Sequence, residues 1–139
     1  MSTATIAVDT SLAVPLLAQT HPLHNQVVDW AEGRALYLSG HAAVEVFSVL
    51  TRLPGDMRLL PEQAATVIGR GFNGVLALPA NVSATVHIEF ARAGIAGGMA
   101  YDALVALAAR AHHTPLATRD KRAQPTYFAV GAEVCLVAL

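Results

Sequence analysis

The sequence predicts an α/β fold in which helices cover both faces of a parallel sheet. Short apolar segments alternate with longer helical segments along all 139 residues, and this alternation is typical of βαβ units. The short segments are uniformly apolar, as in strands that are buried on both faces. A chain of this length fits one compact core, so we expect residues 1–139 to form a single domain.

The first half of the chain predicts three strands, each followed by helices. Residues 3–8 form a strand-like run, and Asp9 then opens a helix in which Pro15 is acceptable only near the first turn. His21 and Pro22 begin a second helix, which Gly33 ends. The remaining predicted elements of this half are a strand at 35–38, a helix at 41–53, a helix from 61 to the glycines at 69, 71 and 74, and a strand at 75–78.

The second half predicts two more strands. Asn81 or Ser83 is expected to cap a helix that runs to about residue 93. Residues 94–98 contain three glycines and precede the most regular helical pattern. The elements predicted after this break are a helix at 99–112, a strand at 115–118, a helix at 123–130 and a strand at 134–138.

Composition and charge exclude several classes of protein. Apolar residues make up 54% of the chain and charged residues 14%, which excludes disorder. The net charge of −1 provides no global basic field, so any contact with RNA must use a local patch. Cys135 is the single cysteine, which excludes an internal disulfide and fits a reducing compartment. Asp9 and Asp102 interrupt the most apolar stretches, so we expect a cytoplasmic protein without membrane contact.

Four acidic residues are predicted to meet at one edge of the sheet. Ligands of open parallel sheets bind beyond the carboxyl ends of the strands. Asp9 follows the first strand, and Asp120 follows the strand at 115–118. Glu45 lies in the first turns of the helix after the second strand. Asp102 begins the helix at 99–112 and reaches this edge if that helix runs antiparallel to the next strand.

Such a cluster points to a divalent cation. Carboxylates gathered in a partly buried site repel one another, and each buried unpaired charge costs several kcal/mol. Mg²⁺ and Mn²⁺ favour oxygen ligands and activate water for attack on a phosphodiester. Helix capping is the alternative for Asp9 and Asp120. Glu45 and Asp102 lie in apolar helices, where an acid needs a partner.

Four short segments surround these acids. They are Val8-Asp9-Thr10-Ser11, Ala43-Val44-Glu45-Val46, Tyr101-Asp102-Ala103-Leu104 and Ala117-Thr118-Arg119-Asp120. Asp120-Lys121-Arg122-Ala123 continues into a tail that contains Tyr127 and Gly131. In these segments, which together span nearly the whole chain, the sequence resembles the PIN-domain nucleases and more narrowly the VapC toxins of toxin–antitoxin systems.

The resemblance implies a three-layer α/β/α PIN-like domain whose central sheet has five strands in the order 3-2-1-4-5. It implies an endoribonuclease dependent on Mg²⁺ or Mn²⁺, a homodimer, and inhibition by a VapB-type antitoxin. Carried over, Asp9, Asp102 and Asp120 bind the metal. Glu45 completes the catalytic set by positioning the metal or its water, and Ser11 assists through its hydroxyl. A catalytically silent PIN-like module that binds RNA or protein is the alternative.

Basic residues near the acids are candidates for RNA contact. Arg119, Lys121 and Arg122 surround Asp120, and Arg52 lies two helical turns from Glu45, so all four are candidates for phosphate binding. Charge balancing of the carboxylates is the alternative. Lys121 and Arg122 also stand where many relatives carry a further acid, so the number of metal ions stays open.

Two further motifs are assigned structural roles. The segment from Gly69 to Gly74 matches G-x-G-x-x-G but follows a helix and precedes a strand, which is the reverse of the dinucleotide-binding context. We therefore interpret it as a helix end and a turn. His21 and His24 lie one turn apart without further ligands at a suitable spacing, so a solvated pair is favoured over a zinc site.

Overall fold

The computed structural model describes residues 3–139. It contains a five-stranded parallel sheet in the order β3-β2-β1-β4-β5, which confirms the predicted fold class and topology. The strands are β1 (Ala4–Val8), β2 (Arg34–Ser39), β3 (Gly74–Leu76), β4 (Leu116–Thr118) and β5 (Val134–Leu136). The helices are α1 (Thr10–Leu17), α2 (His24–Ala31), α3 (Ala42–Leu50), the 3₁₀ turn η1 (Gly55–Met57), α4 (Pro61–Gly71), α5 (Ala80–Ser83), α6 (Val86–Arg92), α7 (Met99–Ala111) and α8 (Gln124–Ala129).

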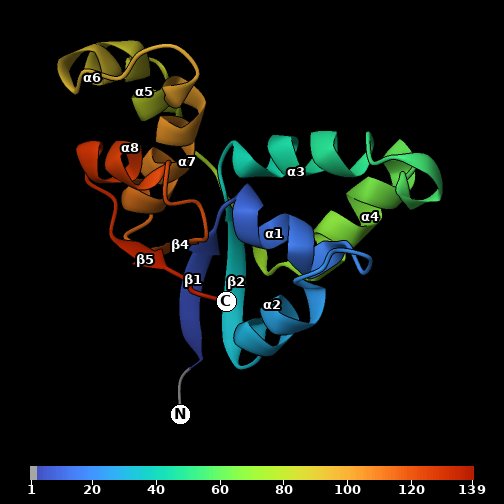
Figure 1. Cartoon of the computed structure of the whole chain (residues 1–139). Coiled ribbons are helices and arrows are strands. Elements are labelled where there is room, and N and C mark those ends of the chain that lie inside the picture. Colours follow the sequence, from blue (N-terminus) through green and yellow to red (C-terminus); the bar gives the residue numbers. More distant parts are fainter. Residues whose placement is uncertain (1–2) are drawn as a thin grey trace.

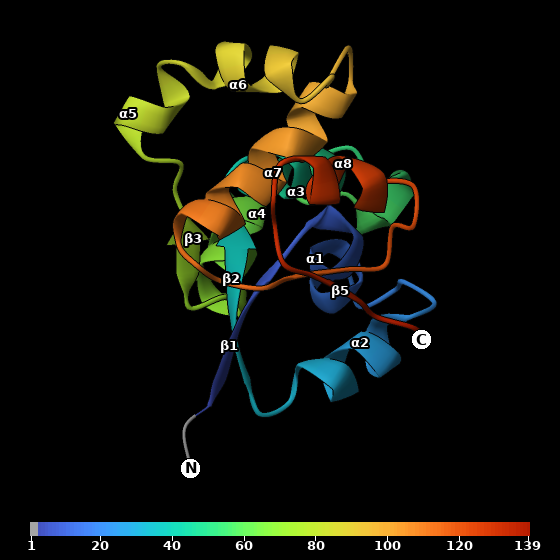
Figure 2. The same ribbon diagram turned by 90° about the vertical axis from the view of Figure 1, so that its left-hand side faces the viewer.

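Helices cover the sheet on both faces. Figure 1 shows α1 and α2 on one side of β1 and β2, and α7 with α8 on the other side. The helices α5 and α6 lie at the top of the molecule in both views (Figures 1 and 2). The starts of α1 and α3 follow directly from the carboxyl ends of β1 and β2, which brings these helix ends to the sheet edge predicted for ligand binding.

The core is built from aliphatic side chains of the sheet and its covering helices. Leu12, Leu38, Leu50, Leu107 and Leu116 are each at most 1% exposed. Such burial of a leucine side chain contributes about 1.5–3 kcal/mol. The prediction that all strands are buried on both faces was only partly right: β4 is fully buried, whereas the edge strands β3 and β5 and the first residues of β1 and β2 include exposed positions.

The turn between β2 and α3 needs a glycine. Gly40 has φ +51°, and a Cβ atom at this position would lie 2.8 Å from the Cβ of Ala108 in α7. Only glycine meets both conditions without strain. Ser39 adds a further link, because its buried hydroxyl donates a hydrogen bond of 2.6 Å to the Val105 carbonyl. The start of α3 is thereby held against α7.

Pro15 lies inside α1 and not near its first turn, so that prediction was wrong. Proline has no N–H, which leaves the Ser11 carbonyl without its helical partner. Arg119 replaces that partner, since its Nη1 donates to the Ser11 carbonyl across 2.9 Å. A side chain more than 100 positions later in the chain therefore compensates for the proline.

The single helix predicted after Asn81 or Ser83 is in fact two short helices, α5 and α6. Their N-cap residues are Pro79 and Thr85, and neither makes a side-chain capping bond. The prediction that the segment from Gly69 to Gly74 is a helix end and a turn is confirmed, because α4 ends at Gly71 and β3 begins at Gly74.

His21 and His24 are not a solvated pair. Nδ1 of His21 accepts from the Leu23 amide at 3.0 Å, and Nδ1 of His24 lies 2.8 Å from the Pro15 carbonyl. Both side chains thus bind backbone groups where α1 leads into α2. Across residues 3–139, no helix has both the length and the apolar character needed to cross a bilayer.

Candidate active site

Asp9 is the most buried acid of the predicted site, with an exposed fraction of 4%. Its Oδ1 accepts hydrogen bonds from the amide and the hydroxyl of Ser11, at 3.0 and 2.6 Å. Its Oδ2 accepts from the hydroxyls of Thr118 and Tyr127, the latter at 2.8 Å. Asp9 is therefore the N-cap of α1, as the alternative interpretation proposed, but donors from β4 and α8 hold it as well.

Two opposing effects act on the pKa of Asp9. Burial raises the pKa of Asp9 above its ordinary value of 3.8, while the hydrogen bonds from Ser11, Thr118 and Tyr127 oppose that rise. Burial, and then the charge of Asp9, raises the pKa of the Tyr127 hydroxyl. Tyr127 therefore remains a protonated donor at neutral pH.

Asp102 lies in the first turn of α7, where burial and the charges of the other three acids both affect its pKa. Burial is the main cause that raises its pKa above 3.8, followed by the negative charges of Glu45, Asp120 and Asp9. Glu45, Asp120 and Asp9 thus each lie near enough to Asp102 for their charges to disfavour its ionised form. Within residues 3–139, however, no three His, Cys, Asp or Glu side chains form a ready-made metal-ligand cluster.

Glu45 is held by the first residue of α1. The Thr10 hydroxyl donates to Oε2 of Glu45 at 2.7 Å, and Nε2 of His41 lies 3.8 Å from Oε1. The prediction that an acid in this apolar helix needs a partner is confirmed, because Thr10 is that partner. Neither Thr10 nor His41 was predicted as a functional residue, although Thr10 directly follows Asp9.

Asp120 lies in the turn after β4 and does not cap α8, whose N-cap is Ala123. Its Oδ1 accepts from the Arg122 amide at 2.9 Å, and its own amide donates to the Thr118 hydroxyl at 3.0 Å. Thr118 therefore links Asp9 to Asp120. Thr118 was not predicted to have this role, although it lies only two positions before Asp120.

The basic candidates fall into two groups. Arg119 is engaged by α1, because its amide donates to the Ser11 hydroxyl at 2.8 Å in addition to the guanidinium contact with the Ser11 carbonyl. Lys121, Arg122 and Arg52 are exposed. The Nε atom of Arg122 lies 3.7 Å from Oδ1 of Asp120, whereas Arg52 lines a cavity of about 380 Å³ together with Glu45.

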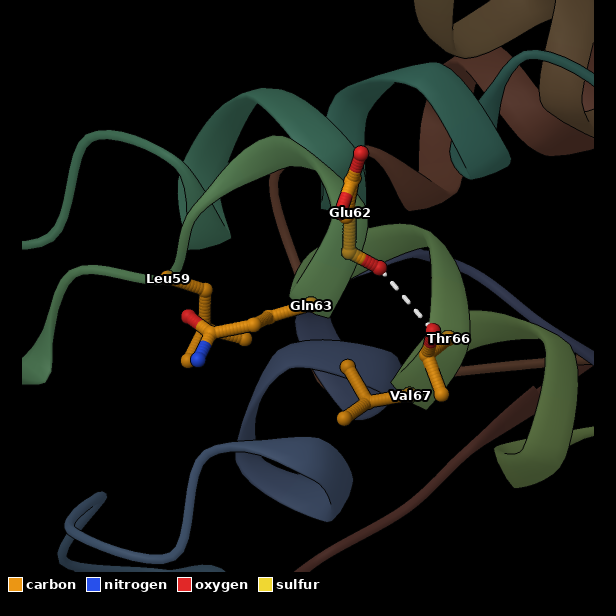
Figure 3. Close-up of a pocket in the computed structure, with 5 residues that line it drawn as sticks. All are labelled: Leu59, Glu62, Gln63, Thr66 and Val67. Carbon is orange, nitrogen blue, oxygen red and sulfur yellow. Dashed lines mark hydrogen bonds between the residues drawn. The ribbon is translucent and has the colours of Figure 1, made fainter.

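A second hollow, of about 460 Å³, lies on the outer side of α4 and lacks these features. Figure 3 shows that the Glu62 carboxylate points away from Val67 and that the Thr66 hydroxyl bonds the Glu62 carbonyl. With one acid and no basic residue, this hollow is a less suitable site than the sheet edge where Asp102 lies near the other three predicted acids.

A model of the PIN domain matches residues 6–129 of the chain. The chain belongs to the PIN-domain family. This PIN domain is 47% identical over 133 residues to Ribonuclease VapC27 of Mycobacterium tuberculosis, covering 96% of this chain and 97% of that protein. It is 41% identical to Ribonuclease VapC40 of the same species, covering 95% and 98%. The predicted resemblance to VapC proteins is confirmed.

Solved structures support the fold. The PIN domain matches a chain in the structure of FitAB bound to an IR36 DNA fragment with a TM-score of 0.65 and 20% identity, over 94% of each chain. It matches a chain of VapBC2 from Rickettsia felis, bound to a promoter DNA fragment, with a TM-score of 0.65 and 12% identity, over 96% and 99%. At these identities the matches show a shared fold.

Proposed function

We propose that this PIN domain is a VapC-like toxin, an endoribonuclease that hydrolyses RNA phosphodiester bonds with the aid of Mg²⁺ or Mn²⁺. The observation that carries the proposal is the placement of three acids near Asp102, whose pKa is raised mainly by burial and then by the negative charges of Glu45, Asp120 and Asp9. Unrelated surface acids seldom accumulate in this way, because their repulsion is unfavourable unless a cation relieves it.

The donor set fits a hard divalent ion. Asp9, Asp102 and Asp120 offer carboxylate oxygens, which Mg²⁺ and Mn²⁺ prefer, and neither sulfur nor imidazole is part of this trio. When bound, the ion supplies a polarised water and neutralises charge on the phosphate. We propose that these three acids hold it.

The surrounding side chains orient the acids. Ser11, Thr118 and Tyr127 hold Asp9 in one rotamer through four hydrogen bonds. Thr10 fixes one oxygen of Glu45, which leaves the other oxygen to orient the attacking water or accept its proton. Lys121, Arg122 and Arg52 are proposed to contact RNA phosphates, while the contacts of Arg119 support a structural role.

We also propose a cognate VapB-type antitoxin as partner, a homodimer and a cytoplasmic location. The FitAB and VapBC complexes among the structural relatives support the antitoxin. The resemblance to VapC toxins implies the homodimer. Co-expression with the antitoxin, followed by light scattering on the purified species, tests both assemblies.

An RNA cleavage assay with Mg²⁺ or Mn²⁺, and with EDTA as a parallel sample, tests the activity. We expect metal-dependent cleavage that falls about 100-fold or more in Asp102→Asn, because this variant removes charge from the cluster. Asp29→Asn, which alters an exposed acid of α2, serves as the matched control and should cleave normally. RNA binding without cleavage under any metal would instead favour the catalytically silent module.

A further inference from the structure

A stacked aromatic pair lies beside the four acids and has no role in the proposed chemistry. The rings of His41 and Tyr101 have centroids 5.4 Å apart and an interplanar angle of 22°. His41 precedes α3 and Tyr101 lies in the first turn of α7, next to Asp102. The pair therefore joins the two helices that carry Glu45 and Asp102.

The outer part of this pair is open to solvent. Tyr101 is 57% exposed, which is unusual for an aromatic side chain that already has a stacking partner. Since His41 stacks on one face of the Tyr101 ring and more than half of the side chain is exposed, we expect the opposite face to accept a further planar group. An unpaired nucleobase is such a group, and base–aromatic stacking tolerates any base.

A groove along α3 continues from this pair. The cavity of about 380 Å³ is lined by His41, Glu45, Ser48 and Arg52. These residues are three or four positions apart, so they lie on one side of α3 and its two ends. His41 also lines a second cavity of about 320 Å³ beside Leu104 and Ser83. His41 thus lines two hollows, and the first of them also contains Glu45.

The far end of the α3 groove carries a free positive charge. Arg52 is exposed and, within residues 3–139, has no carboxylate within salt-bridge distance. His41 lies just before α3 and Arg52 just after it, and the nine residues of the helix between them, which include Glu45, span roughly 14 Å. A strand that contacts both residues would run along the cavity that Glu45 also lines, beside one of the four acids of the proposed nuclease site.

We propose that the His41–Tyr101 pair and Arg52 form a subsite for single-stranded RNA, in which one unpaired base stacks on Tyr101 and a phosphate binds Arg52. This inference rests on the proposed function, because it assigns residues that bind the RNA substrate beside the same site. Single-stranded RNA fits better than a duplex, since the bases of a duplex are already stacked and their faces are covered.

Binding of a fluorescein-labelled 12-nucleotide single-stranded RNA, measured by anisotropy in EDTA so that the strand stays intact, tests the subsite. Tyr101→Ala should weaken binding roughly 5- to 100-fold, as loss of one stacked base predicts. Tyr101→Phe should retain affinity because the ring remains. Arg52→Met should lower the slope of log affinity against log salt by about one.

Phe128→Ala is the matched control, since Phe128 is an aromatic residue of α8 with a similar exposure of 59%. It should leave affinity unchanged. Thermal unfolding checks that each variant is folded. If Tyr101→Ala does not fold, Tyr101→Leu is used in its place. In an RNA that contains one 2-aminopurine, the fluorescence of that base should be quenched by the native chain and not by Tyr101→Leu.

Unchanged affinity in a folded Tyr101→Ala variant, or an equal loss for a 12-base-pair duplex, would overturn the subsite. A cleavage assay of the native chain distinguishes failure of the subsite from failure of the proposed nuclease function. If the native chain cuts RNA but Tyr101→Ala binds and cuts equally well, only the subsite is wrong. If Tyr101→Ala weakens binding but no metal supports cleavage, the subsite stands and the nuclease proposal fails.

Discussion

The hydroxyl of Tyr127 lies 2.8 Å from Oδ2 of Asp9, although the two residues are 118 positions apart in the sequence. This bond ties α8 to the end of β1 at the acidic edge. Tyr127 is 2% exposed, so the bond is shielded from water and its loss cannot be compensated easily.

Tyr127→Phe should lower the free energy of unfolding by about 1–3 kcal/mol, because the buried Asp9 carboxylate loses one of its donors. Urea unfolding followed by circular dichroism measures the change. Tyr101→Phe is the matched control, since that side chain is 57% exposed and its change should stay within about 0.5 kcal/mol. Equal stability of Tyr127→Phe and the native chain would show that the bond contributes nothing.

Thr10→Val should reduce RNA cleavage roughly 10- to 100-fold with little change in stability, because the residue that orients Glu45 loses its hydroxyl. Thr10→Ser should keep most of the activity. Thr66→Val removes a hydroxyl that bonds only the Glu62 carbonyl on α4 (Figure 3), so its kcat/KM should remain at the native level. Full activity in Thr10→Val would exclude the orienting role.

Arg119→Met should destabilise the native chain by about 1 kcal/mol, because the Ser11 carbonyl opposite Pro15 then has no donor. In a Pro15→Ala background the cost should be smaller, since the alanine amide can restore the helical bond to Ser11. A double-mutant cycle of urea unfolding measures this coupling. Lys121→Met, at an exposed position, is the control. Additive effects of the Pro15 and Arg119 changes would show that the two residues are independent.

Stability in EDTA should fall as the pH rises from 3.8 through the raised pKa values of Asp9 and Asp102. A carboxyl whose pKa is raised on folding stabilises the protein below its unfolded pKa, and that stabilisation is lost once the folded group ionises. Asp102→Asn should therefore be more stable than the native chain near neutral pH and show a shallower pH dependence.

Chemical unfolding across the acid range measures this behaviour, with Asp29→Asn as the control at an exposed acid. Adding Mg²⁺ should restore stability to the native chain more than to Asp102→Asn. A native chain that becomes steadily more stable over this pH range, with no difference from Asp102→Asn, would contradict the repulsion described at the site.

Much of the fold could be predicted because its signals are local. Glycine and proline marked the ends of α2 and α4, and apolar runs marked the strands. The split between α5 and α6 was missed because neither N-cap uses a side-chain bond, so the sequence carries no capping signal there. The interior position of Pro15 was missed because its compensation comes from Arg119.

The sequence by itself determined the succession of strands and helices along the chain and the family. It also determined which four acids stand next to strand ends or helix starts. Those features depend on residue type and on spacing along the chain. Only the tertiary structure decided that Thr118 and Tyr127 bond Asp9, that Thr10 bonds Glu45, and that His41 stacks on Tyr101. A hydroxyl or a ring leaves no periodic trace in a sequence, so its partner is known only once packing brings distant segments together.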